Sequence, residues 1–216
     1  MKHTDHAAVD RVLAWLGTGT TLDRSQWEQL DLLADWLAEE AVAGGGLGPG
    51  EPARIWPRHL ADSLTFVRGW AESSPPAHLL DVGAGVGLPG IPLAILWPTT
   101  LITLLDRSVR RVDLARRAVR QLGLSNVEVV QGDVLEERRK WGGVVFRAVF
   151  PPERAGVVGE SLLDTGGVAV IGLRGPANRR AATLVAPGQR STQIVDVPAT
   201  VLDGAASLLI MGTSEH

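Results

Sequence analysis

The feature that most constrains the fold is a glycine-rich loop placed directly after a short apolar run. The run at 78–81 reads His-Leu-Leu-Asp, and the loop continues as Val-Gly-Ala-Gly-Val-Gly-Leu-Pro-Gly to Gly90. Pro89 and Pro92 suit the first turn of a following helix. Glycines allow a tight turn and let a ligand approach the backbone N–H groups at a helix N-terminus. The loop therefore predicts a ligand site between a buried strand and a helix.

The rest of the chain indicates an α/β fold, because short apolar runs alternate with helical patterns. This alternation predicts a mostly parallel, doubly wound sheet with helices on both faces. Residues 101–105 are apolar almost throughout, which favours a central strand covered on both faces. Residues 193–197 and 206–211 are expected to form an antiparallel hairpin at the sheet edge. The other expected strands are 78–81, 101–106, 127–130, 144–146 and 168–171.

Residues 1–50 are expected to form a helical extension ahead of the main domain at 51–216. Apolar residues recur there at helical spacing, and Ser25-x-x-Glu28 resembles a capping box. The segment 44–50 reads Gly-Gly-Gly-Leu-Gly-Pro-Gly, a composition typical of a flexible linker. The two expected helices of the extension cover residues 5–16 and 25–43.

Composition excludes several kinds of site. The chain has no cysteine, so disulfides, thiol nucleophiles and thiolate metal sites are excluded, and none of its five histidines stands in an HExxH arrangement. No apolar run reaches the roughly 18 residues that a membrane span needs, and the N-terminus lacks the plan of a secretory signal. We therefore expect a cytoplasmic protein that binds neither a metal nor a membrane, and we favour a monomer.

Acidic residues follow three of the expected strands and bear on the identity of the ligand. Asp81 precedes the loop, where it can meet the ammonium of S-adenosylmethionine but would repel a pyrophosphate. Asp106 ends the second strand, 19 residues after Gly87, where an acid accepts hydrogen bonds from both ribose hydroxyls. Asp133 follows the third strand and can accept from an adenine amino group. Together the three acids favour S-adenosylmethionine.

Each observation has an alternative interpretation. The spacing Gly85-x-Gly87-x-x-Gly90 also matches the dinucleotide fingerprint, and Asp106 suits both cofactors, so a Rossmann dehydrogenase is a competing hypothesis. An aspartate after a strand is often a turn former or a helix N-cap, and for Asp133 this interpretation is nearly as good. The set of three acids discriminates between cofactors better than any single acid does.

Four short motifs carry a family resemblance. They are Arg58-His59-Leu60-Ala61-Asp62-Ser63-Leu64, then Leu88-Pro89-Gly90-Ile91-Pro92-Leu93, then Leu104-Leu105-Asp106, and finally Arg147-Ala148. Over about residues 30–209 the chain resembles the glucose-inhibited division protein B family, bacterial methyltransferases that act on guanine N7 of 16S ribosomal RNA. The resemblance implies a Rossmann-like methyltransferase fold, S-adenosylmethionine as cofactor, and ribosomal RNA or the small ribosomal subunit as partner.

The resemblance also implies roles for particular residues. Arg147 follows the fourth expected strand, whose end faces the cofactor methyl and the substrate in related enzymes. Arg58 and His59 join Arg147 as candidates for aligning the substrate, and no residue is assigned a catalytic role. For Arg58 the alternative is an ion pair with Asp62 one helical turn later. The expected cofactor-binding residues are Asp81, Gly83, Ala84, Gly85, Gly87, Leu88, Asp106, Arg107, Asp133, Val134, Leu135 and Arg147.

The chain departs from the family pattern in three places. An Asn-Leu-Thr segment ahead of the Arg-His motif is replaced by the glycine linker and residues 51–56, and Asp106-Arg107-Ser108 lacks the usual Gly-Lys pair. Residues 203–207 read Asp-Gly-Ala-Ala-Ser instead of Asp-Gly-Glu-Arg-His, which removes two potential phosphate or base contacts. Three hypotheses follow: a 16S ribosomal RNA guanine-N7 methyltransferase, a paralogue that methylates another RNA or a small molecule, and a cofactor-binding protein without transfer activity.

Charge and aromatic residues add modest support for RNA. The formal net charge is −3, yet residues 107–120 hold six arginines with only Asp113, and no acid occurs from 174 to 190. Solvated arginines are the default explanation, although two basic regions could flank the cleft. Of the seven tryptophans, Trp56 and Trp141 are the two candidates for stacking on a base.

Overall fold

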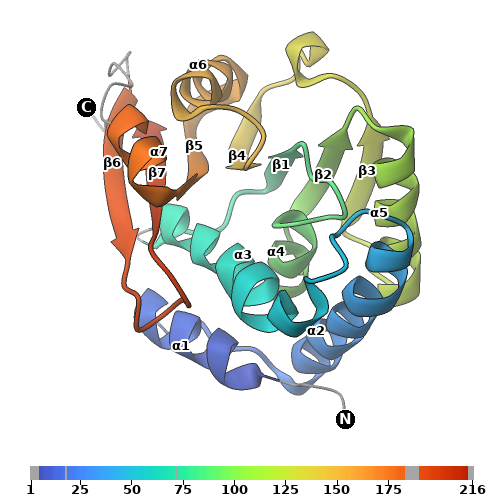
Figure 1. The fold of residues 1–216 in the computed structure, drawn as a ribbon. Helices are drawn as coiled ribbons and strands as arrows, with labels where there is room; N and C mark the ends of the chain where they lie inside the picture. Colours follow the sequence, from blue (N-terminus) through green and yellow to red (C-terminus); the bar gives the residue numbers. More distant parts are fainter. Residues whose placement is uncertain (1–4, 18, 72, 183–189, 214–216) are drawn as a thin grey trace.

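The computed structural model describes residues 5–17, 19–71, 73–182 and 190–213. These residues form one seven-stranded sheet with the strand order β3-β2-β1-β4-β5-β7-β6 (Figure 1). The strands are β1 (His78–Val82), β2 (Leu101–Asp106), β3 (Val127–Gln131), β4 (Trp141–Arg147), β5 (Leu163–Arg174), β6 (Arg190–Val197) and β7 (Ala206–Thr213).

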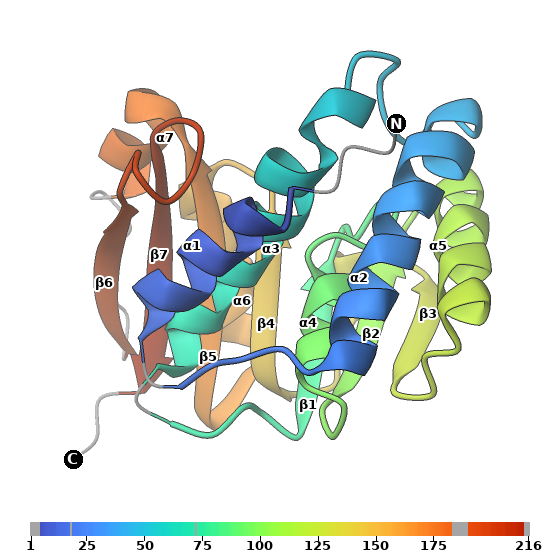
Figure 2. The ribbon, with the colours of Figure 1, turned by 90° about the horizontal axis from the view of Figure 1, so that it is seen from below.

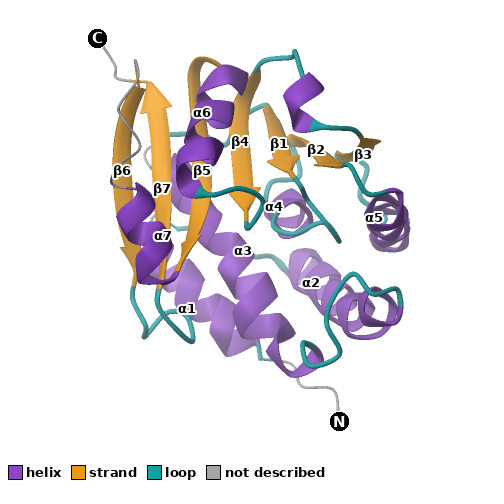
Figure 3. Ribbon diagram, turned by 45° about the horizontal axis from the view of Figure 1, so that its top comes forward, coloured by secondary structure: helices purple, strands orange, loops and turns teal. Residues whose placement is uncertain are grey.

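The pairing of the strands confirms the predicted sheet. The pairs β1–β2, β2–β3, β1–β4 and β4–β5 are parallel, whereas β7 pairs antiparallel with both β5 and β6. Figure 3 shows this antiparallel hairpin at one edge of the sheet. The parallel strands place their carboxyl ends along one edge of the sheet, where ligands bind in open α/β folds.

The prediction that β2 is central is wrong, because β2 is second from the edge and β4 is the middle strand. The apolar run in β2 has another cause. Ile102 and Leu104 belong to one hydrophobic core and Leu105 belongs to the core on the opposite face. The apolar run therefore indicates that both faces of β2 are covered, and a strand does not need a central position for that.

Helices cover both faces of the sheet, as predicted. Figure 1 shows α6 and α7 on one face and the other labelled helices on the opposite face. Figure 2 shows α1 and α3 over the half of the sheet formed by β4 to β7, and α2, α4 and α5 over the half formed by β1 to β3. Within the described ranges, no helix combines the length and hydropathy that a membrane span requires. The helices are α1 (His6–Leu16), α2 (Arg24–Trp36), α3 (Asp62–Leu64), α4 (Gly90–Leu96), α5 (Val109–Leu122), α6 (Pro152–Leu162) and α7 (Gly175–Ala182).

Shorter helical turns join these elements. Two π-helical turns cover Leu37–Ala41 and Ile55–Ala61, and 3₁₀ turns cover Pro52–Arg54, Thr65–Trp70 and Val134–Glu136. The two predicted N-terminal helices are present as α1 and α2. Their apolar faces, including Val12 and Leu33, lie in the same hydrophobic core as Leu79 of β1.

The start of α2 differs from the prediction. Asp23 is the N-cap: its carboxylate accepts from the backbone N–H of Gln26 at 2.8 Å, and the side chain of Gln26 accepts from the backbone N–H of Asp23 at 2.8 Å. The predicted box of Ser25 and Glu28 is therefore wrong, because an aspartate and a glutamine two positions earlier make the same reciprocal pair. Gln26 also donates to the carbonyl of Ile95 at 2.8 Å, which ties α2 to α4.

The glycine-rich segment after α2 is folded back and packed, so the prediction of a flexible linker is wrong for this part. The backbone N–H groups of Gly44 and Gly46 donate to the carbonyls of Glu40 and Ala41, both at 2.8 Å. A Cβ atom at Gly46 would collide with Val86 in the glycine loop after β1. The glycines thus permit close packing against the loop.

Asn126 stabilises the turn that precedes β3. Its side-chain amide donates at 3.1 Å to three backbone carbonyls, those of Ala94, Trp97 and Thr100. We expect Asn126→Asp to lower the free energy of unfolding by about 3 kcal/mol, because a carboxylate has no donor for these buried carbonyls. Urea unfolding measures the effect, and an unchanged midpoint would contradict this explanation.

Candidate active site

The glycine loop connects β1 to α4 as predicted, and its backbone requires glycines. Gly83, Gly85 and Gly87 have φ angles of 66°, 60° and 96°, in the left-handed region that favours glycine. A Cβ atom at Gly83 would lie 2.6 Å from Cγ2 of Val149. The backbone N–H of Gly83 donates to the carbonyl of Leu105 at 2.7 Å, which fixes the loop against the end of β2.

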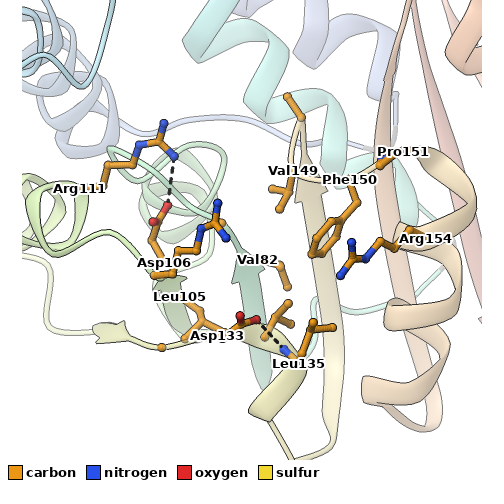
Figure 4. Close-up of a pocket in the computed structure, with 15 residues that line it drawn as sticks. Val82, Leu105, Asp106, Arg111, Asp133, Leu135, Val149, Phe150, Pro151 and Arg154 are labelled. Atoms are coloured by element: carbon orange, nitrogen blue, oxygen red, sulfur yellow. Dashed lines mark hydrogen bonds and ion pairs between the residues drawn. The ribbon is translucent and has the colours of Figure 1, made fainter.

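A cavity of 440 Å³, here termed the first cavity, opens beside this loop (Figure 4). Its volume lies within the range of about 300–1,000 Å³ that is usual for small-molecule sites. Its walls come from the ends of β1 and β2, the turn after β3 and the segment after β4. Among the predicted cofactor-binding residues, those that line it are Gly83, Asp106, Arg107, Asp133, Val134 and Leu135.

Asp106 is buried, with 5% of its surface exposed, and its carboxylate accepts two backbone hydrogen bonds. Gly85 donates its N–H to Oδ2 at 3.0 Å, and Ser108 donates its N–H to Oδ1 at 2.8 Å. Arg111 Nη1 lies 3.8 Å from Oδ2. Each carboxylate oxygen has two lone pairs, so each retains an acceptor position after these bonds. Such a pair of oxygens fits the two hydroxyls of a ribose.

Asp133 also lines the first cavity and serves as the N-cap of the helical turn Val134–Glu136. Its Oδ1 accepts from the backbone N–H of Leu135 at 3.0 Å (Figure 4). The side chain of Asp133 is exposed, while Val134 beside it is buried. The capping interpretation of Asp133 is confirmed, and the contact with an adenine amino group stays a prediction.

Asp81 does not line the first cavity. It lies fully buried behind the loop, where Oδ2 accepts from the backbone N–H of Gly90 at 2.7 Å and Oδ1 has no hydrogen-bond partner in the described part of the chain. Burial raises the pKa of Asp81 to about 7. The structure gives Asp81 a role in fixing the start of α4. Its contact with an ammonium stays a prediction.

The pKa of Asp81 leads to a prediction about stability. At pH values between 3.8, the ordinary pKa of aspartate, and about 7, the folded protein binds more protons at Asp81 than the unfolded chain does. The contribution of Asp81 to stability therefore falls as the pH rises through this range and is constant above pH 7. Asp81→Asn removes the titration and keeps an acceptor for the N–H of Gly90. We expect the stability of the variant minus that of the wild type to increase across this window, then level off. Urea unfolding at a series of pH values tests this, and a constant difference would contradict it.

The other predicted cofactor residues lie next to the first cavity without lining it. Ala84 and Leu88 are buried within the loop, and Gly85 and Gly87 supply its turns. Arg147 ends β4 and points into a different space. Sequence reasoning missed Phe150 and Arg154, which line the first cavity from the segment after β4 and stack with 4.7 Å between the guanidinium carbon and the ring centroid.

A second cavity, of 530 Å³, adjoins the first at Ala148, which lines both. Ala148 has a φ of 57° and is the one non-glycine residue with a positive φ in the described part of the chain. Backbone strain of this kind occurs at functional sites. The predicted alignment residues Arg58, His59 and Arg147 all line the second cavity. The structure therefore brings these three together beside the first cavity.

Arg147 holds the wall of the second cavity through several contacts. Its Nε lies 3.2 Å from Oδ2 of Asp62, and its Nη2 donates to the carbonyl of Arg58 at 3.2 Å and lies 3.0 Å from Nδ1 of His59. Arg174 of β5 binds the other oxygen of Asp62 at 2.6 Å. The side chains of Arg147 and Asp62 are 18% and 7% exposed, so this is a largely buried ion pair.

The predicted alternative for Arg58, an ion pair with Asp62, is wrong. Asp62 faces β4 and β5, where two arginines reach it, whereas Nε of Arg58 lies 3.7 Å from Oε2 of Glu51. Glu51 also contacts Nε2 of His59 at 2.7 Å. Sequence reasoning missed both Glu51 and Asp62 as members of the site.

The prediction that Trp56 or Trp141 stacks on a base is wrong. Both are buried, with 5% and 4% of their surface exposed. Trp56 packs against the ring of His6 with centroids 4.9 Å apart, and Arg139 lies over Trp141 at 4.7 Å. Neither side chain offers a free face to a nucleotide.

Two observations fit the first cavity to S-adenosylmethionine. Asp106 presents a pair of acceptors for a diol, and the cavity lies at the carboxyl ends of parallel strands, where open α/β folds bind ligands. Solved structures share the fold. The chain superposes on cofactor-bound Rv0187 from MTB with a TM-score of 0.61 and 17% identity, covering 86% of this chain and 90% of that one. For N-methyltransferase NodS from Bradyrhizobium japonicum, in complex with S-adenosyl-L-homocysteine, the values are 0.60, 17%, 82% and 99%.

Sequence comparison gives the family. A family model described as GidB, rRNA small subunit methyltransferase G, matches residues 26–185. The ribosomal RNA small subunit methyltransferase G of Mycobacterium marinum is 34% identical over 186 residues, which cover 82% of this chain and 80% of that protein. The protein of the same name from Streptomyces coelicolor is 34% identical over 189 residues, covering 84% and 78%. These findings remove the dehydrogenase alternative. The chain belongs to the GidB family of rRNA small subunit methyltransferases.

Proposed function

We propose that this protein transfers a methyl group from S-adenosylmethionine to N7 of a guanine in 16S ribosomal RNA. Family membership supports the reaction and the cofactor. The observation that carries the proposal is the pair of adjoining cavities: the first holds the diol acceptor Asp106, the second is lined by arginines, and Ala148 lies where they meet.

The proposed cofactor site uses the residues predicted from the sequence. Asp106 accepts from the ribose hydroxyls, and Asp133 with Val134 and Leu135 holds the adenine. Arg107 lines the same wall, and the loop presents its backbone through Gly83. The cofactor supplies, when bound, an electrophilic methyl group on a sulfonium. The remaining predicted residues shape the loop or its junction with the second cavity, namely Asp81, Ala84, Gly85, Gly87, Leu88 and Arg147.

The second cavity suits a nucleophile that can attack without first losing a proton. Both ring nitrogens of His59 are engaged, by Arg147 and by Glu51, and both oxygens of Asp62 face arginines. Of the described residues that line this cavity, Asp203 is the remaining carboxylate, and its side chain is 71% exposed. Guanine N7 needs no base to remove a proton. The residues of the chain then contribute alignment and a suitable electrostatic environment.

We further propose that the protein binds its RNA substrate within the small ribosomal subunit, in the cytoplasm, and that it acts as a monomer. Residues 1–50 would be a helical extension of the methyltransferase domain at 51–216. The exposed arginines that line the second cavity suit a phosphate backbone, because guanidinium groups bind phosphate oxygens in a bidentate manner. They are Arg54, Arg58 and Arg174.

A second candidate function is methylation of another RNA or of a small molecule. Ala206 and Ser207, which stand where the family pattern has larger charged residues, line the second cavity. The hydroxyl of Ser207 donates to Asp196 at 2.7 Å and is therefore committed to a neighbour. This part of the wall offers no charged contact, which favours a substrate different from that of the relatives.

Mapping of 16S ribosomal RNA from cells with and without the gene tests the proposal. We expect one guanine to carry an N7 methyl group in the parent strain and to lose it on deletion, as seen by mass spectrometry of nuclease fragments. Unchanged N7 methylation in the deletion strain would contradict the proposal and leave the second candidate.

A further inference from the structure

We propose that Glu51 is a positioning residue, which fixes the ring of His59 so that His59 holds Arg147 at the junction of the two cavities. This inference rests on the proposed function, because the residues at the junction are taken to align the substrate of methyl transfer. Glu51 lies in the segment 51–56 that precedes the Arg58-His59 motif.

The contacts of His59 determine which ring nitrogen carries the proton. A guanidinium has donors and no acceptor, so Nδ1 of His59, 3.0 Å from Nη2 of Arg147, must be the acceptor. The proton of the neutral ring is then on Nε2, which lies 2.7 Å from Oε2 of Glu51 and can donate to it. Glu51 therefore selects the tautomer that Arg147 requires.

The three residues come from separate elements, and Arg147 directly precedes Ala148, the residue that lines both cavities. Glu51 precedes the turn Pro52–Arg54, His59 lies in the π-helical turn after it, and Arg147 ends β4 immediately before Ala148. His59 is 6% exposed, so water cannot readily replace either partner. If the ring of His59 rotated, Arg147 would lose one of its acceptors. Ala148, which follows Arg147 and lines both cavities, would then be held less firmly.

Charge gives the arrangement a measurable dependence on pH. The charged groups that face His59 are Glu51, Arg58 and Arg147; burial and the charge of Arg147 lower the pKa of His59, while Glu51 raises it. Protonation of His59 places a hydrogen on Nδ1, facing the guanidinium, and breaks the contact. Transfer activity should therefore be lost as the pH falls through the pKa of His59.

The first test uses the protein without substrate. In ¹⁵N imidazole NMR spectra of the full chain, we expect His59 to be protonated on Nε2 in the wild type and to exchange between tautomers in Glu51→Ala. Glu51→Gln keeps an acceptor without the charge, so its His59 should stay protonated on Nε2 and titrate at a lower pH than in the wild type. A wild-type His59 protonated on Nδ1, or an identical spectrum in Glu51→Ala, would overturn the proposal.

The second test follows methyl transfer. We expect Glu51→Ala to lower kcat about tenfold through misalignment, with little change in the KM for the cofactor, and Glu51→Gln to recover most of the loss and to move the acid limit to lower pH. Glu28→Ala, which removes an exposed ion-paired glutamate of α2, is the matched control and should behave as wild type.

A double-mutant cycle separates positioning from general damage. The amide oxygen of His59→Asn stands near the position of Nδ1 and does not titrate, so in that background Glu51→Ala should cause little further loss. Additive losses would overturn the inference. Absence of any transfer to 16S RNA by the wild type, with the NMR result as expected, would instead count against the proposed function.

Discussion

Asp106→Ala is expected to weaken the binding of S-adenosylmethionine about 100-fold or more, because two acceptor positions of a charged group are lost from a buried site. The loop should loosen as well, since Gly85 and Ser108 both donate to this carboxylate. Isothermal titration calorimetry on the purified protein measures the affinity directly.

Asp106→Asn is the matched control for this experiment. An amide keeps one acceptor but turns a donor toward one of the two hydroxyls or backbone N–H groups, so we expect an affinity between those of the wild type and the alanine variant. Wild-type affinity in Asp106→Ala would contradict the assignment of the first cavity.

Arg147→Ala is expected to abolish detectable methyl transfer and to lower the free energy of unfolding by about 3 kcal/mol. Removing one partner of a buried ion pair costs roughly 3–5 kcal/mol, and the lower end applies because Arg174 still neutralises Asp62. A domain of this size should remain folded at 25 °C, since total stabilities are about 5–15 kcal/mol. Thermal unfolding and a transfer assay at that temperature separate the two effects.

Two controls accompany the Arg147 variant. Arg147→Lys keeps the charge but cannot make contacts to Asp62, His59 and a carbonyl at once, so it should recover stability more than transfer. Arg24→Ala removes an exposed arginine of α2 whose partner Glu28 is also exposed, and should change neither property. Unchanged stability and turnover in Arg147→Ala would contradict the role of the network.

Local patterns in the sequence were sufficient to predict most of the fold. Short apolar runs gave the strands and the edge hairpin, and the glycine loop with Asp106 and Asp133 gave the wall of the first cavity. These features succeed because neighbouring residues determine them: a strand, its turn and the residue that ends it lie within about ten positions.

Contacts between distant segments were not predictable in the same way. Asp62 looked like a helix residue paired with Arg58, but the sheet brings Arg147 and Arg174 to it from two adjacent strands. Likewise, the composition of residues 44–50 indicates flexibility, and only the position of Val86 in the folded chain explains why the glycines pack there. The positive φ of Ala148 has no signal in its residue type.

The most direct measurement of the central claim is methyl transfer by the purified protein to 16S RNA in small ribosomal subunits from the deletion strain. With S-adenosylmethionine labelled in its methyl group, nuclease digestion and chromatography identify the modified nucleoside. We expect label in 7-methylguanosine, and we expect Arg147→Ala to abolish it. Label in another nucleoside, or none in RNA while the cofactor binds normally, would contradict the proposed function.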